Sequence, residues 1–155
     1  MDVNADLEAP VGPERLFAWV EDLGRYPSWL DIVARAETAE ARAGDPGPAW
    51  VVDLRGRLGP LARSKRLRMA RVEHVQPGDG AEGRVRFERR ETDGRSHAPW
   101  VLTARVTGTA EGSRLLMHLH YGGSLWGPVL ERLLGDEISR SRQRLLDGLA
   151  AEPAT

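Results

Sequence analysis

The chain has 155 residues, a hydrophobic fraction of 41%, a charged fraction of 29% and a net charge of −1, values typical of a globular protein and not of a disordered one. This length suits a single domain, residues 1–155, with its own core. There is no cysteine, which excludes disulfides, thiolate metal sites and a cysteine nucleophile. Because the sequence shows no leader-like segment and no run of about 18 apolar residues, we expect a cytoplasmic protein without a membrane span.

The first thirty residues predict a strand followed by two short helices. Residues 2–9 predict the strand, since Pro10 pushes Ala9 into extended geometry. Pro13 suits the first turn of a helix that Gly24 closes, with one apolar face formed by Leu16, Phe17 and Val20. A second helical turn is expected to hold Tyr26, Pro27, Trp29 and Leu30, with Pro27 near its start because proline is tolerated there.

Short extended runs then alternate with turn signals rich in glycine, proline and aspartate. Six more strands are predicted, at 32–43, 48–57, 61–75, 83–91, 98–110 and 113–123. Their hairpin-length connections predict an antiparallel sheet. The last segment differs, because its leucines and isoleucine recur at spacings of three and four. It predicts a long amphipathic helix from about 128 to 149 that packs on the sheet.

This order of elements covers nearly the whole chain and resembles a known fold. More specific features are Ala9-Pro10 ahead of Leu16-Phe17, the segment from Asp22 to Leu30, and Tyr121 before the long helix. Together they resemble the helix-grip fold of the START and Bet v 1-like (SRPBCC) superfamily, and within it bacterial polyketide cyclase/dehydrase-like proteins. The resemblance implies an α+β fold in which a curved seven-stranded antiparallel sheet wraps around the C-terminal helix. Members include aromatase/cyclases and carriers of lipids, so function does not follow from fold.

Alternation with a period of two assigns one face of each strand to the interior. The inward residues are expected to line a cavity for a small hydrophobic or amphipathic molecule. The candidate ligand-binding residues are Trp50, Val52, Leu54, Lys65, Leu67, Met69, Phe87, Arg89, Trp100, Leu102, Met117, Leu119 and Tyr121. The alternative is that these side chains only pack on the terminal helix.

Three cations lie on the same strand faces as the inward residues, beyond the apolar positions, and they suggest an anionic ligand. Arg63 and Lys65 share the face of Leu67, and Arg89 shares the face of Phe87. A buried cation needs a partner, either an acidic side chain or an anionic ligand. The alternative is that all three are solvated or paired, since a single β-bulge would reverse their direction.

No nucleophile elbow, phosphate loop or dinucleotide-binding motif is present, so the hydrolase and nucleotide-dependent classes are disfavoured. A cyclase or dehydratase needs only an apolar cavity and one polar group, and Tyr121 and Arg89 are the catalytic candidates. His118 and His120 are expected to face water, and no third ligand has metal-binding spacing, so we expect no metal and no cofactor.

Three functions remain open. The first is binding or transport of a small hydrophobic or amphipathic ligand, and the second is a polyketide cyclase or dehydratase. The third uses the block 55–90, which holds 11 basic and 4 acidic residues and could meet RNA or an acidic protein. Nucleic acid is the least favoured partner because the exposed aromatics that stack on single strands are missing. The sequence leaves the oligomeric state open.

Overall fold

The computed structural model describes residues 1–58, 61–122 and 127–153, except for the side chains of 57, 58, 61–63, 127–131, 133 and 134. A single antiparallel sheet has the strand order β1-β7-β6-β5-β4-β3-β2. Its strands are β1 (Asp2–Ala9), β2 (Val33–Ala39), β3 (Ala49–Leu58), β4 (Leu61–Val75), β5 (Gly83–Arg89), β6 (Trp100–Thr109) and β7 (Gly112–Tyr121). The helices are α1 (Pro13–Ala18), the 3₁₀-helix η1 (Leu23–Ser28) and α2 (Gly127–Ala151).

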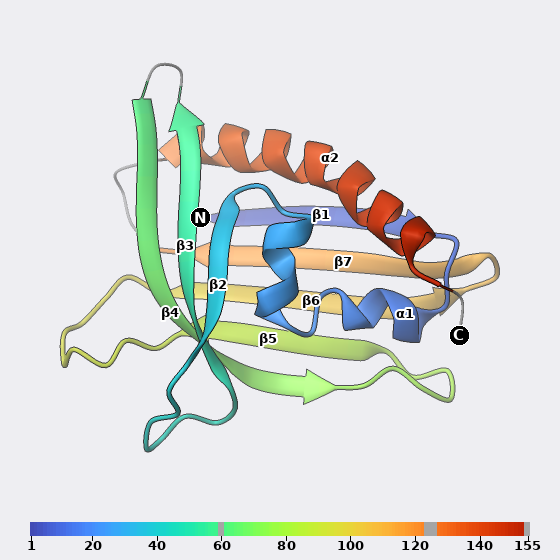
Figure 1. Cartoon of the computed structure of the whole chain (residues 1–155), viewed down its shortest axis with the longest axis horizontal. Helices are drawn as coiled ribbons and strands as arrows, with labels where there is room; N and C mark the ends of the chain where they lie inside the picture. The colour runs from blue at the N-terminus through green and yellow to red at the C-terminus, as the bar shows by residue number, and fades with distance from the viewer. Residues whose placement is uncertain (59–60, 123–126, 154–155) are drawn as a thin grey trace.

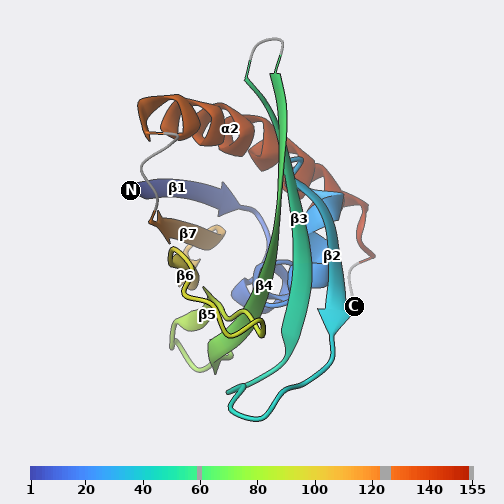
Figure 2. The ribbon, with the colours of Figure 1, turned by 90° about the vertical axis from the view of Figure 1, so that its left-hand side faces the viewer.

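The sheet bends around α2, as Figures 1 and 2 show. β1, β7, β6 and β5 run nearly parallel to α2, whereas β2, β3 and most of β4 cross them at a steep angle. The register of β4 against β5 shifts between Arg71 and Glu73, and a bulge of this kind increases the local bend of a strand. The predicted α+β helix-grip fold is therefore confirmed. The connection between β1 and β2 places α1 and η1 over the concave face of the sheet.

The two short helices differ in detail from the prediction. α1 ends at Ala18, and Gly24 does not close it. Gly24 instead donates its backbone N–H to the Asp22 carboxylate at 2.8 Å, because Asp22 is the N-cap of η1. Pro27 lies inside η1 and not near its start. A 3₁₀-helix of two turns contains few backbone hydrogen bonds, so the missing N–H of proline is tolerated there.

Several strands are shorter than predicted, by two to four residues at an end. β2 stops at Ala39 and not at 43, because the next residues form a turn in which Asp45 accepts the Arg42 N–H at 2.8 Å. β5 stops at Arg89, and β7 stops at Tyr121. β4 keeps its predicted bounds of 61–75.

An arginine buried on the outer side of the sheet holds that turn in place. Arg68 is 7% exposed, and its guanidinium binds both Asp45 carboxylate oxygens, at 2.7 and 3.0 Å. It also donates to the carbonyls of Glu40 and Arg90. Because both terminal nitrogens of the guanidinium have acceptors, the ion pair joins the 40–45 segment to the centre of β4.

Candidate functional site

A cavity of about 120 Å³ lies between the concave face of the sheet, η1 and α2. Strand residues in its wall are Val3, Ala5, Asp6, Leu7, Val33, Val52, Leu54, Leu67, Met69, Trp100, Leu102, Leu115, Met117 and Leu119. The remainder are Leu23, Tyr26, Trp29, Leu30 and Ile32 at η1 and after it, and Glu137, Ile138, Arg142 and Leu145 on α2. Nearly all of these side chains are apolar, so the cavity suits an apolar guest.

Most of the candidate ligand-binding residues line this cavity. They are Val52, Leu54, Leu67, Met69, Trp100, Leu102, Met117 and Leu119. The register explains this, since Val52 pairs with Leu67 and Leu102 pairs with Leu119. Cross-strand partners share one face of a sheet.

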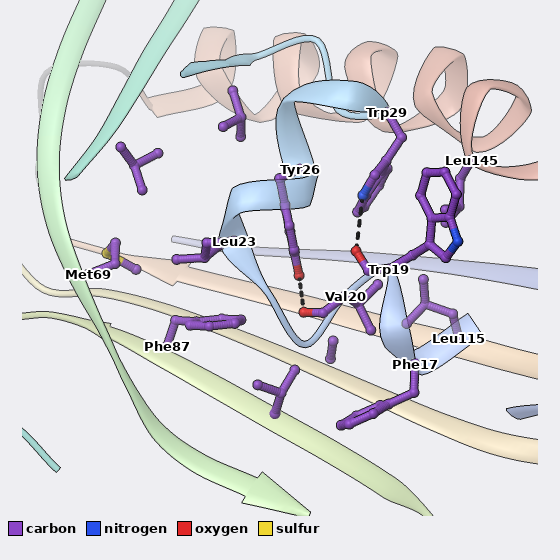
Figure 3. Close-up of a cluster of buried hydrophobic side chains, with 14 of the residues drawn as sticks. Phe17, Trp19, Val20, Leu23, Tyr26, Trp29, Met69, Phe87, Leu115 and Leu145 are labelled. Atoms are coloured by element: carbon purple, nitrogen blue, oxygen red, sulfur yellow. Dashed lines mark hydrogen bonds between the residues drawn. The ribbon is translucent and has the colours of Figure 1, made fainter. Parts of the chain in front are cut away.

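Two predicted aromatic residues point inward but are covered. Trp50 and Phe87 are 4% and 0% exposed, and their rings meet edge to face with centroids 5.6 Å apart. Tyr26 of η1 adds a second edge-to-face contact with Phe87 at 6.3 Å. η1 therefore packs over this part of the sheet, on the side of Phe87 (Figure 3). Neither Trp50 nor Phe87 is part of the cavity wall.

Two of the three inward cations, Lys65 and Arg89, do not line the cavity. Arg89 pairs with Met69 across the sheet, but its Nε binds Glu91 at 3.0 Å and its side chain is only 10% exposed. Lys65 is exposed, and its Nζ lies 5.8 Å from the centroid of the Trp100 ring. Partial burial, and then the nearby Arg89 guanidinium, lower the pKa of Lys65. The side chain of Arg63 lies outside the described residues.

Tyr121 closes one end of the sheet. Its ring stacks on Trp100 with centroids 5.1 Å apart, and its hydroxyl donates to the sulfur of Met1. The side chain is 2% exposed, so the hydroxyl is covered and does not reach water. Neither catalytic candidate, Tyr121 or Arg89, belongs to the wall of the cavity.

The sequence reasoning missed the parts of the wall that come from η1 and α2. In Figure 3, Tyr26 and Trp29 extend from η1 into the space between α2 and the sheet. The Tyr26 hydroxyl donates to the Val20 carbonyl at 2.9 Å, and the Trp29 indole N–H donates to the Trp19 carbonyl at 3.3 Å. Complete burial raises the pKa of Tyr26, so this phenol is held neutral as a donor. Alternation along β1 could have identified Val3, Ala5 and Leu7.

Three ionisable residues belong to the wall on the side of β1 and α2. Arg142 of α2 lies 3.6 Å from the Asp6 carboxylate of β1, and both side chains are about half exposed. Arg114 also approaches Asp6, at 3.3 Å. Glu137 is 13% exposed and forms an ion pair with Arg140 one turn along α2. Each of the three thus has an oppositely charged neighbour, and most other side chains of the wall are apolar.

The histidines of β7 lie on the outer face. His118 and His120 contact one Asp2 carboxylate oxygen at 2.9 and 3.0 Å, and the contact with His120, followed by that with His118, lowers the pKa of Asp2. Within the described residues no cluster of histidine, cysteine, aspartate or glutamate could hold a metal ion. Among the described helices, none combines the length and apolarity needed to cross a membrane.

Comparison with solved structures shows the same fold at low sequence identity. A START superfamily protein from Mycobacterium smegmatis superposes with a TM-score of 0.66 at 16% identity, covering 96% of this chain and 97% of that one. A STAR-related lipid transfer protein from Xanthomonas axonopodis gives 0.62 at 14% identity, covering 95% and 84%. The di-domain ARO/CYC StfQ from the steffimycin biosynthetic pathway gives 0.62 at 17% identity, covering 96% and 50%.

Sequence comparison supplies the family. No curated protein sequence matches the chain. A family model described as "Polyketide cyclase / dehydrase and lipid transport" matches residues 1–152. That match spans the sheet, η1 and α2, which together enclose the cavity, and the chain therefore belongs to the polyketide cyclase / dehydrase and lipid transport family.

Proposed function

We propose that this protein binds a small, predominantly apolar molecule in the cavity between the sheet, η1 and α2. The observation that carries this proposal is the wall itself, in which side chains such as Leu67, Met69 and Met117 surround about 120 Å³. An engineered apolar cavity of about 150 Å³ in another protein binds benzene. A molecule with a single ring is therefore the appropriate size for the cavity as it stands.

The charges around the cavity favour a neutral ligand over an anionic one. Arg89 already binds Glu91, Arg142 already binds Asp6, and the ammonium of Lys65 lies over Trp100. A carboxylate that entered the apolar cavity would lose its hydration and would have to break one of these contacts for compensation. The anionic version of the ligand thus has less support than the neutral one.

The two other functions have less support as well. The cyclase hypothesis assigned its polar group to Tyr121 or Arg89, and neither of these two residues lines the cavity. Arginines of the basic block form ion pairs at the surface, for example Arg66 with Asp53 at 2.7 Å and Arg84 with Glu73 at 2.8 Å. Charges that are already paired attract RNA or an acidic protein less strongly.

Calorimetric titration with toluene tests the proposal. We expect saturable binding to the natural protein and at least a tenfold loss of affinity in Ala5→Leu, because the larger side chain enters the space beside Met117, its cross-strand partner. Asn4→Leu is the matched control, since residue 4 precedes Ala5 on the same strand and is exposed. Absence of toluene binding, or equal losses in both variants, would refute the proposal.

A further inference from the structure

Two polar atoms beside the cavity have no partner within the described part of the chain. They are the indole Nε1 of Trp100 and the Oε2 of Glu137, and both are buried. Both residues belong to the wall of the cavity. Native proteins leave few buried polar atoms without a hydrogen bond, and each exception calls for an explanation.

The other polar groups of the wall are already engaged. The Tyr26 hydroxyl and the Trp29 indole donate to backbone carbonyls, and Asp6 pairs with Arg142. The hydroxyl of Ser141 is also buried without a partner, but Ser141 does not line the cavity. Among the described residues, the buried polar atoms left over beside the cavity are therefore one donor and one acceptor.

Each of the two side chains is held by contacts on its other side. The Trp100 ring stacks on Tyr121 and lies beneath the ammonium of Lys65. The other carboxylate oxygen of Glu137, Oε1, binds Arg140, so Oε2 is the oxygen left for a further hydrogen bond. A charged acceptor of this kind makes stronger hydrogen bonds than a neutral one.

We propose that Glu137 and Trp100 determine ligand specificity, with Glu137 Oε2 accepting a hydrogen bond from a ligand hydroxyl and Trp100 Nε1 donating one to a ligand carbonyl. The ligand class is then an apolar molecule that carries a hydroxyl and a carbonyl group. This inference rests on the proposed function of the cavity. Because both atoms are covered by their neighbours, a side-chain rotation accompanies binding, as is common when a ligand binds.

Two pairs of ligands with matched shapes test the two hydrogen bonds separately. Phenol and toluene differ by a hydroxyl in place of a methyl group, and acetophenone and cumene differ by a carbonyl oxygen in place of a methyl group. In a wall without polar groups the oxygen-bearing member binds far more weakly, since it loses its hydrogen bonds to water. With the two groups in use, we expect phenol and acetophenone to bind at least as tightly as toluene and cumene.

Variants then assign each effect to its residue. In Glu137→Met the ratio of phenol to toluene affinity should fall at least tenfold, while the ratio of acetophenone to cumene affinity stays unchanged. In Trp100→Phe the acetophenone-to-cumene ratio should fall and the phenol-to-toluene ratio should stay unchanged. The ratio within each pair removes any general effect of a variant on the cavity. In the natural protein, NMR should also show the Trp100 indole N–H resonance shifting with acetophenone more than with cumene.

The outcomes separate this inference from the proposed function. If toluene and cumene bind the natural protein and their oxygen-bearing partners bind tenfold more weakly, the cavity is a binding site but the inference is wrong. The inference is also wrong if each variant changes both ratios alike. If no member of either pair binds, the proposed function fails, and the inference fails with it.

Discussion

The pair formed by Arg68 and Asp45 shows how one residue can determine the course of a loop. Their side chains are each 8% exposed, and Asp45 is the only acidic residue between Glu40 and Asp53. Hydrogen bonds from the Arg68 guanidinium, and then from the Arg42 backbone N–H, lower the pKa of Asp45 to about 2. Removing one member of a buried pair leaves the other without compensation, so this contact matters more than a surface ion pair.

Acid should therefore weaken the fold through Asp45. Its pKa in the folded protein lies below the ordinary value of 3.8, so the stabilisation is complete above about pH 5 and is lost as the pH falls toward 2. By urea unfolding, the difference in unfolding free energy between the natural protein and Asp45→Asn should shrink by about 1.5 kcal/mol from pH 5.5 to pH 2.5. Glu37→Gln, which removes an exposed pair with Arg35, is the control and should change by less than about 0.5 kcal/mol. A pH-independent difference for Asp45→Asn would contradict the prediction.

The C-terminal half of α2 packs closely on the rest of the fold. Leu145 and Leu149 are each 1% exposed, and the Arg15 guanidinium donates to the Leu149 carbonyl at 2.9 Å. Gly148 lies between these leucines, and a Cβ at that position would come within 2.5 Å of the Trp19 ring. The absence of a side chain at 148 therefore lets α2 lie directly on Trp19.

Two glycines of α2 should respond in opposite ways to alanine. At Gly135 a Cβ would meet no atom within 4 Å, so Gly135→Ala should stabilise the protein by about 1 kcal/mol through helix propensity alone. At Gly148 the clash with Trp19 should outweigh that gain and cost about 1–3 kcal/mol net. Thermal unfolding of the two variants measures both effects. Equal shifts in the melting temperature would mean that α2 does not pack on Trp19 as described.

The cavity as a whole should discriminate against charge. For the matched pair benzoate and methyl benzoate, we expect the ester to bind at least tenfold more tightly. The carboxylate loses its hydration on entering the cavity, while Arg89 and Arg142 are held by Glu91 and Asp6. Calorimetry at low ionic strength measures the dissociation constants of benzoate and methyl benzoate. Tighter binding of benzoate that is lost in Arg142→Gln would contradict this expectation and would make Arg142 an anion-binding residue.

The fold could be predicted from the sequence, and the cavity only in part, for physical reasons. Alternation fixes which face Val52, Leu67 and Leu102 present, because the side-chain period of a strand is two. It cannot tell that η1 covers Phe87, or that Arg89 turns to Glu91, since both depend on how distant segments pack. The directions of Glu137 and Arg142 on α2 depend on how the helix is rotated about its axis over the sheet. The apolar stripe defines that rotation only coarsely, because the stripe is itself about 100° wide.

The strand order has a consequence for the way the chain reaches its folded state. β1 pairs along its whole length with β7, from Asp2 opposite His120 to Ala9 opposite Ser113, so β1 cannot form its native pairing until β7, the last strand of this sheet in chain order, has been made. Contacts so distant along the chain slow folding, because the entropy of closing a large loop is lost before they form. Until β7 is made, Val3 and Leu7 on the inner face of β1 lack their native neighbours. Exposed apolar side chains and unpaired strand edges of this kind make an incomplete chain prone to aggregation.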